Sequence, residues 1–372
     1  MNYKKYLTDN ILPFWLDNAI DKEKGGIFYS LDKNGNNDCK DKNIWFSGRA
    51  LWSFANAYNT VDKKTEYLNT CKSIYDFIKG CILPDGRLPF LTDSSGNAKE
   101  QKKLFHGEAH AAMGCAAYYK ACNDENVKTD ALKFFSTAYN MYMSDEARKE
   151  SCPGGKERYI FGRDMLALAI AQTMRAGGIS DKRIEILAKK SLDNIINTGY
   201  VDDISKTVNE YAGFNGEVYD YSCYGHLYEA AWFILYEGEI KKDNKIKELG
   251  KKILDYCLTR NKNQKFGAIP LDSKFPNNEF LWWPQCEAVI AYYVAYSIFK
   301  DEFYIECAKQ TEDFAFKTFG DNNGKEWFSK CDSKGNIIDD SKGSLIKGVF
   351  HLPRMLMILE VLQKNGNITE WM

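Results

Sequence analysis

YGHLYEAAWFILYEGEIKKDNKIKELGKKILDYCLTR, residues 224–260, contains the unit that decides the fold. Its first half, which includes EAAWFIL, is apolar around much of the circumference that a helix would have, and this predicts a helix buried on most sides. Its second half, IKKDNKIKELGKKILDYC, is amphipathic and charged, as in a helix with one face in solvent. We therefore predict an inner helix at 223–237 and an outer helix at 242–260.

The same pair of helices recurs along the chain. Short connections such as 60–62 alternate with long ones such as 85–96, which carry Gly, aromatic and turn residues. The apolar helices begin about sixty residues apart, so the sequence predicts a repeated helical hairpin. The predicted helices are 3–20, 45–59, 63–80, 105–123, 126–147, 162–177, 181–198, 223–237, 242–260, 283–298, 301–318 and 352–364.

Six hairpins of this kind predict a closed ring. Such repeats cannot bury their apolar faces alone, and open solenoids usually repeat at about 30 to 50 residues. A longer period that stops at six favours a toroid, a single domain over 1–372, with the apolar helix of each pair inside. The long connections, with short β-hairpins in them, then all lie at the end where the inner helices begin, and we expect the functional site there.

Composition excludes several classes of function. The 372 residues include 50 basic and 51 acidic side chains, a net charge of −1, which argues against a nucleic-acid or membrane-surface footprint. The 11 cysteines contain no CxxC pair, so we expect neither a disulfide framework nor a zinc knuckle, and we expect a cytoplasmic protein. The first 21 residues do not resemble a signal peptide, and no apolar run is long enough to span a bilayer.

Ionisable and aromatic side chains occupy the first turns of several predicted inner helices. Two of the chain's four histidines stand at equivalent places, the starts of the fourth and sixth inner helices. We expect these side chains to converge on one axial pocket. They are Arg49 from the first inner helix, His226 and Glu229 from the fourth, Trp283 and Glu287 from the fifth, and His351 and Arg354 from the sixth.

Structural roles are alternatives for these residues. A histidine at a helix start is often a cap or a satisfied core group, although two at equivalent positions weaken that interpretation. Carboxylates on apolar helix faces are costly to bury unless paired. Glu287 paired with Arg49 across the ring is therefore an alternative to direct contact with a ligand, and Trp282 and Trp283 could both be core residues.

His106 and His110 are four residues apart at the start of the second inner helix, a spacing that can hold a metal ion. No HExxH motif is present, and Arg49 and Arg354 would oppose a dication in the same pocket. We therefore expect no metal and expect His106 to line the pocket. GGKER at 154–158 lacks the pattern of a phosphate-binding loop, and we expect a turn there.

Five stretches together resemble the N-acylglucosamine 2-epimerase family: GRALWSFA (48–55), GHLYEAAWF (225–233), LWWPQCEA (281–288), EWF (326–328) and KGVFHLPR (347–354). The match runs from about Gly25 to Leu362 and implies an (α/α)6 barrel. It implies that His226 and His351 are an acid/base pair, supported by pocket residues Arg49, Glu229, Glu287 and Arg354. This chain departs from the family in having Tyr224, where Pro is common, and in 199–221 and 163–165, which match poorly.

The resemblance implies a 2-epimerase or an aldose–ketose isomerase that acts on a free reducing sugar. The hydrogen on C2 is acidic only when C1 is a free carbonyl, and inversion needs proton transfer on both faces. His226 and His351 could flank one sugar, Arg49 and Arg354 could stabilise the enolate oxygen, and one of Trp282 and Trp283 could stack on the sugar. Helix N-termini disfavour positive charge, so we expect both imidazoles to be neutral.

We therefore expect an enzyme that interconverts N-acetylglucosamine and N-acetylmannosamine, because FHLPR and WWPQCEA look most like the N-acylhexosamine enzymes. The alternatives are a mannose-type isomerase or another 2-epimerase, a glycoside hydrolase that uses Glu229 and Glu287, and a non-catalytic sugar-binding or protein-interaction repeat. We expect no required cofactor. Some family members respond to nucleotides, but no nucleotide motif is present here, and a homodimer is an expectation from the family alone.

Overall fold

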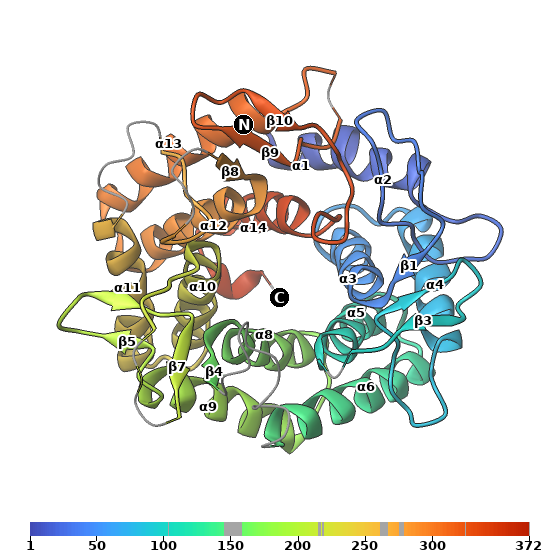
Figure 1. Cartoon of the computed structure of the whole chain (residues 1–372), viewed down its shortest axis with the longest axis horizontal. Coiled ribbons are helices and arrows are strands. Elements are labelled where there is room, and N and C mark those ends of the chain that lie inside the picture. Colours follow the sequence, from blue (N-terminus) through green and yellow to red (C-terminus); the bar gives the residue numbers. More distant parts are fainter. Residues whose placement is uncertain are drawn as a thin grey trace.

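The computed structural model describes residues 1–102, 104–144, 158–214, 217, 219–260, 267–274, 279–323 and 325–371. The end of the predicted helix 126–147, residues 154–157 of the GGKER stretch, and parts of the long connection at 265–275 lie outside these residues. Across the described residues, paired helices form a closed ring around a central axis (Figure 1).

The inner wall of the ring consists of the apolar helices. Among the described residues these are α3 (Ile44–Thr60), α5 (His106–Cys122), α8 (Phe161–Ala176), α10 (Tyr224–Ile240), α12 (Trp282–Phe299) and α14 (His351–Asn365). The outer wall contains α4 (Thr65–Gly80), α6 (Glu125–Met143), α9 (Lys182–Asn197), α11 (Asn244–Arg260) and α13 (Glu302–Phe319). The predicted (α/α)6 barrel is thus confirmed, with the predicted inner and outer faces.

The N-terminal segment supplies the remaining part of the outer wall. It runs as α1 (Tyr3–Tyr6), a π-helical turn (Leu7–Ile11) and α2 (Leu12–Asn18), where the sequence predicted one helix over 3–20. Pro13 explains the irregular turn, because it lacks the N–H that an α-helix would donate to the carbonyl of Asp9.

Small residues let neighbouring inner helices approach closely. Gly48 on α3 faces the backbone of α5, and a Cβ added there would stand 2.5 Å from the carbonyl carbon of His110. On α5, alanines 109, 111, 112, 116 and 117 are all buried. This approach places the first turns of α3 and α5 side by side on the wall of the ring.

Contacts between the two ends of the chain close the ring. α14 packs against α3, α1 and the π-helical turn, and the backbone N–H of Lys4 donates to Glu360 Oε2 at 3.2 Å. Glu326 Oε2 accepts from the indole of Trp15 on α2 at 2.7 Å, and its Oε1 accepts from Lys347 Nζ at 3.1 Å. The side chains of Lys347 and Glu326 are 0% and 1% exposed, so this ion pair is buried where the two ends of the chain meet.

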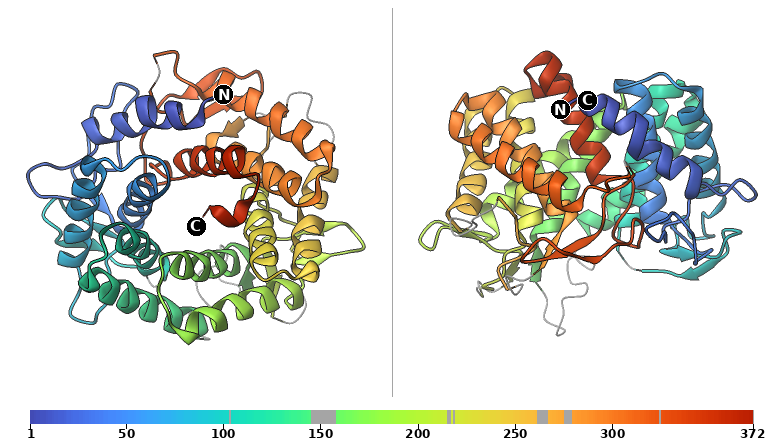
Figure 2. Two further views of the ribbon diagram at one scale, coloured as in Figure 1. Left: turned by 180° about the vertical axis from the view of Figure 1, so that it is seen from behind. Right: turned by 90° about the horizontal axis from the view of Figure 1, so that it is seen from above.

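Short strands organise the long connections at one end of the ring (Figure 2). Two antiparallel sheets have the orders β1–β2–β3 and β10–β9–β8, and two further pairs are β4–β7 and β5–β6. Three strands lead directly into inner helices: β1 into α3, β4 into α8 and β8 into α12. The strands are β1 (Lys42–Asn43), β2 (Leu91–Thr92), β3 (Ala98–Glu100), β4 (Arg158–Ile160), β5 (Val201–Asp202), β6 (Thr207–Val208), β7 (Tyr211–Gly213), β8 (Glu279–Leu281), β9 (Lys330–Asp332) and β10 (Ile337–Asp339).

The opposite end of the axis is filled by the C-terminal segment. After α14 the chain forms a 3-10 turn, η2 (Ile368–Glu370), that packs against α14 and α10 and lies near the ring centre in Figure 1. Trp371 is 1% exposed, and its ring centroid lies 6.0 Å from that of Trp52 on α3. Among the described residues, no helix has both the length and the apolarity needed to cross a membrane.

Replacing Lys347 by Met should destabilise the ring, because it leaves the buried carboxylate of Glu326 without its cation. Removing one partner of a buried ion pair typically costs about 3–5 kcal/mol, and chemical denaturation should measure a loss of this size. Lys33→Met is the matched control, since the Lys33–Asp340 pair is exposed and should contribute less than about 1 kcal/mol. Equal effects of the two substitutions on the free energy of unfolding would contradict the claim that the buried ion pair stabilises the closed ring.

Candidate active site

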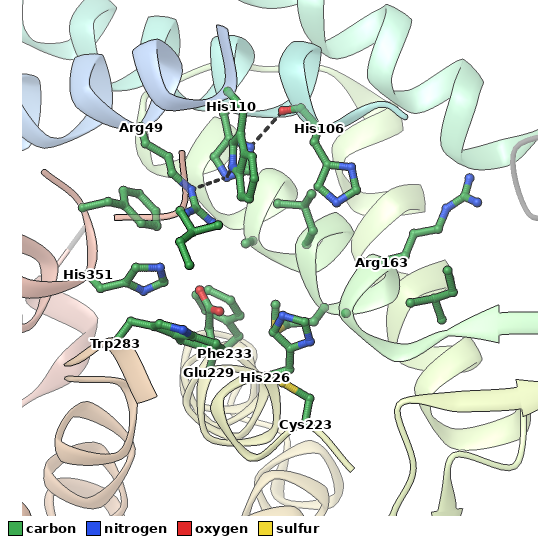
Figure 3. Close-up of a pocket in the computed structure, with 18 of the residues that line it drawn as sticks. Arg49, His106, His110, Arg163, Cys223, His226, Glu229, Phe233, Trp283 and His351 are labelled. Carbon is green, nitrogen blue, oxygen red and sulfur yellow. Dashed lines mark hydrogen bonds between the residues drawn. The ribbon is translucent and has the colours of Figure 1, made fainter. Parts of the chain in front are cut away.

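A cavity of about 460 Å³ lies at the end of the ring where the inner helices begin, and residues of all six inner helices line it (Figure 3). All four histidines of the chain line this cavity. The predicted site residues that line it are Arg49, His106, His226, Glu229, Trp283, His351 and Arg354. Glu287 does not line it; its side chain is 0% exposed and lies behind the wall.

His351, the first residue of α14, is fixed by a carboxylate. Its Nδ1 lies 2.7 Å from Glu287 Oε1, so Nδ1–H donates to the carboxylate and Nε2 keeps its lone pair. Burial lowers the pKa of His351 well below 6.5, and the charges of Arg49 and Arg354 lower it further. His351 is therefore neutral at neutral pH, as expected from the sequence, and can accept a proton.

His226, in the first turn of α10, has the opposite electrostatic environment. Burial lowers its pKa, but Cys223 and the carboxylate of Glu210 outweigh burial and raise the pKa well above 6.5. Its Nδ1 lies 3.0 and 3.1 Å from the two oxygens of Glu210. The expectation that this imidazole is neutral is therefore wrong, because the sequence did not reveal the acidic partner.

Glu210 lines the cavity beside His226, and the sequence analysis missed it. It directly precedes β7, whose pairing with β4 brings it beside the start of α8, and the backbone N–H of Gly162 donates to its Oε1 at 3.1 Å. A Cβ at Gly162 would stand 2.9 Å from both Glu210 Oε1 and His226 Nδ1. The one available signal was a glutamate inside the strand-like stretch TVNEYAGF, in a connection that matched the family poorly.

Arg354 joins the carboxylates of Glu229 and Glu287. Its Nη2 donates to Glu229 Oε1 and, at 2.6 Å, to Glu287 Oε1, and the indole of Trp232 donates to Glu287 Oε2 at 2.9 Å. The suggested pairing of Glu287 with Arg49 is therefore wrong. Because Glu229 and Glu287 share one guanidinium, they do not flank the cavity as the two carboxylates of a glycoside hydrolase must.

Arg49 presents its charge to the cavity. Its Nε donates to His110 Nε2 at 3.2 Å, and its guanidinium lies 4.4 Å from the ring of Trp45 and 4.7 Å from that of Phe350. Burial lowers its pKa to about 9, so Arg49 stays charged at neutral pH. Its side chain thus places a fixed positive charge between α3 and α14.

The pair His106 and His110 does not form a metal site. His110 Nδ1–H donates to the carbonyl of His106 at 2.9 Å, and its Nε2 accepts from both Arg49 and Trp45, so both nitrogens are engaged. His106 lines the cavity as predicted, and burial together with the charge of Arg49 lowers its pKa to about 4. His110 therefore positions Arg49, while His106 offers a neutral imidazole to the cavity.

Trp283 lies between the two candidate acid/base residues. Its ring centroid is 5.3 Å from that of His351 and 5.7 Å from that of His226. Figure 3 shows the indole between the two imidazoles. A Cβ at Gly225 would stand 2.1 Å from its ring, which explains the glycine before His226. Trp282 is 1% exposed and belongs to the core, so Trp283 alone of this pair lines the cavity.

Comparison with known proteins identifies the family. Residues 25–351 match the family model described as N-acylglucosamine 2-epimerase (GlcNAc 2-epimerase). The chain belongs to the N-acylglucosamine 2-epimerase family. This confirms the resemblance seen in the five sequence stretches, and makes the chain an enzyme of the isomerase class, a carbohydrate epimerase.

Relatives cover nearly the whole chain. The N-acylglucosamine 2-epimerase of Bos taurus is 24% identical over 380 residues, which is 96% of this chain and 89% of that protein. A cellobiose 2-epimerase of Ruminococcus albus is 25% identical over 351 residues, 88% of this chain and 89% of that protein. A sugar epimerase from a ruminal bacterium has the same fold, with a TM-score of 0.86, 24% identity and coverage of 98% of both chains.

Nitrogen-15 NMR of histidine-labelled protein should reveal the protonation state of each imidazole in the cavity, since the chain has only four histidines. We expect one doubly protonated imidazole at pH 7, that of His226, and three neutral ones. Glu210→Gln should lower the pKa of His226 and leave the other three neutral, because it removes the adjacent negative charge. Asp203→Asn, on the outer surface, is the control and should change none of them. Four neutral imidazoles in the parent protein would contradict the assignment.

Proposed function

We propose that this enzyme is a sugar 2-epimerase that interconverts N-acyl-D-glucosamine and N-acyl-D-mannosamine by proton transfer at C2, with His226 and His351 as the acid/base pair. The observation that carries the proposal is the opposite protonation preference of two imidazoles on the wall of one cavity. Epimerisation through an enolate needs one group ready to accept a proton and another ready to donate one.

The mechanism begins with the open-chain sugar, whose C1 carbonyl makes the C2 hydrogen acidic. His351 takes the C2 proton through Nε2, and the electron pair moves into the C1–C2 bond as negative charge develops on O1. Arg49 supplies the positive charge that stabilises this oxygen. His226 then returns a proton to the opposite face of C2, which inverts the centre; in the reverse reaction the two histidines exchange roles.

The placement of the pair suits transfer on two faces. His226 and His351 come from α10 and α14, which are separated by α12, and Trp283 from α12 lies between their rings. A sugar that lies against this indole would have one imidazole on each side. We propose that Trp283 is the platform for the sugar, and that Glu229, Glu287 and Arg354 hold the platform and His351 in place.

The remaining wall supports an N-acyl substrate. Buried apolar side chains of α5 and α8, Met113, Met165, Leu166 and Ala169, line the cavity and could receive the acyl chain. His106 lines it too, and its Nδ1 has no hydrogen-bond partner in the described structure, so it could bond to the amide. The name of the Bos taurus relative, which matches 96% of this chain, supports the same substrate class.

The wider cellular setting is also part of the proposal. Proton transfer between imidazoles requires no cofactor, since Arg49 supplies the charge that the enolate needs. All ten cysteines of the described residues are free thiols, which suits a reducing cytoplasm. We retain the homodimer as an expectation from the family and propose no nucleotide effector.

Turnover in deuterium oxide distinguishes this function from its alternatives. A panel of free N-acetylmannosamine, N-acetylglucosamine, mannose and cellobiose should show inversion with deuterium at C2 for the N-acyl sugars, by NMR. Deuterium at C1 would instead indicate an aldose–ketose isomerase, and turnover of cellobiose alone another 2-epimerase. No reaction with any N-acylhexosamine would refute the proposal.

Two single variants should separate proton exchange from inversion. His226→Asn and His351→Asn should each lower epimerisation by about 10²-fold or more, yet each should still exchange the C2 proton of one epimer with solvent deuterium. The two variants should act on different epimers. His226→Asn retains the neutral base His351 and should exchange at neutral pH, whereas His351→Asn retains only the protonated His226 and should exchange only at a pH above the pKa of that residue. Asp203→Asn is the surface control. Exchange of the same epimer by both variants would count against transfer on two faces.

The pH profile should follow the two histidines. Activity requires neutral His351, whose pKa is lowered, so the rate should fall only when the pH drops well below 6.5. It also requires protonated His226, whose pKa is raised, so the rate should fall when the pH rises well above 6.5. Initial rates should therefore show a broad plateau around neutrality. Glu210→Gln should move the alkaline limb to lower pH, and a shift of the acid limb alone would contradict the assignment.

A further inference from the structure

His226 is also part of a cluster of three side chains, and the proposed proton transfer gives no reason for that cluster. The carboxylate of Glu210, the thiol of Cys223 and the imidazole of His226 each offer an atom, and these atoms all lie within 4.8 Å of one another. All three residues line the cavity, and Figure 3 shows Cys223 beside His226. The group is therefore open to a solute that enters the cavity.

The local structure brings the side chains of Glu210, Cys223 and His226 close together. Cys223 is the N-cap residue of α10, but its side chain makes no capping hydrogen bond. His226 follows three residues later in the first turn, so the thiol and the imidazole share one helix face. Glu210 reaches them from the connection before β7 and is held by the backbone N–H of Gly162.

Sulfur, nitrogen and carboxylate oxygen together form a ligand set that suits zinc. Three protein ligands with one position open to solvent or substrate are typical of accessible zinc sites, and thiolate favours zinc over magnesium or calcium. A second group, Glu229, Glu287 and His351, is equally compact. There the guanidinium of Arg354 already binds both carboxylates and would repel a cation, so that group is not a candidate.

Although the sequence led us to expect no metal in this pocket, we propose that Glu210, Cys223 and His226 bind one zinc-type divalent ion, and that this ion reversibly inhibits the enzyme. Binding releases to solvent the protons carried by the thiol and by the imidazolium, and forms bonds from sulfur, nitrogen and oxygen to the metal. The ion takes over the ring of His226, which can then no longer exchange a proton with C2. Ion binding is independent of the proposed function, whereas the inhibition rests on it.

Cobalt(II) is the probe for binding, because a thiolate bound to cobalt gives a charge-transfer absorption in the near ultraviolet. Titration of the metal-free protein should give this band with one equivalent per chain, and zinc should displace it. Cys223→Ser should abolish the band, and Glu210→Gln should weaken binding. Cys307→Ser, on the outer helix α13, is the matched control and should keep the band. No band, or a band unchanged in Cys223→Ser, would overturn the site.

Zinc inhibition is measured separately, with each variant compared with its own chelator-treated rate. Zinc should inhibit the parent enzyme, and a chelator should restore the rate. Cys223→Ser should raise the zinc concentration for half inhibition at least about tenfold, while Cys307→Ser should leave it unchanged. Equal inhibition of Cys223→Ser and the parent would overturn the proposal. Cobalt binding by a protein that epimerises no sugar would support the site and refute the proposed function instead.

Discussion

The carboxylate of Glu287 connects three neighbouring inner helices. From α12 it accepts hydrogen bonds from His351 and Arg354 on α14 and from Trp232 on α10. A fully buried carboxylate is stable only when such partners compensate for lost hydration. The positions of the neutral imidazole of His351 and of the guanidinium of Arg354 depend on this arrangement.

The two histidines show that a carboxylate neighbour does not by itself determine protonation. Glu287 beside His351 is shared with Arg354, and Arg49 lies near, so the surroundings of that ring oppose a further positive charge. Glu210 beside His226 instead accepts from a neutral backbone N–H, so its charge remains available to the ring. The same pair of residue types thus yields a neutral imidazole at one place and a protonated one at the other, because Arg49 and Arg354 lower the pKa of His351 whereas Cys223 and Glu210 raise that of His226.

The sequence alone predicted the ring, because the period of about sixty residues and the alternation of apolar and amphipathic helices follow directly from burial. It also predicted that His226 and His351, which stand at equivalent positions of the repeat, line one pocket. It did not predict Glu210, since that residue reaches the site through the pairing of β4 with β7, and sequence spacing does not reveal strand pairing. The partners of Glu287 were missed for a similar reason: helix periodicity gives the face of a residue, but which opposite charge it meets depends on how neighbouring helices cross.

The 3-10 turn η2 lies close to the axis of the ring, at the end opposite the long connections (Figure 2). This turn packs against α14 and α10, so we expect a sugar to reach the cavity from the end where the connections lie. Substrate and product would then use the same entrance to the cavity, and each product molecule would have to leave before the next substrate molecule enters. The enzyme does not change the equilibrium constant, so net conversion runs toward the equilibrium ratio of the two epimers from whichever side is in excess.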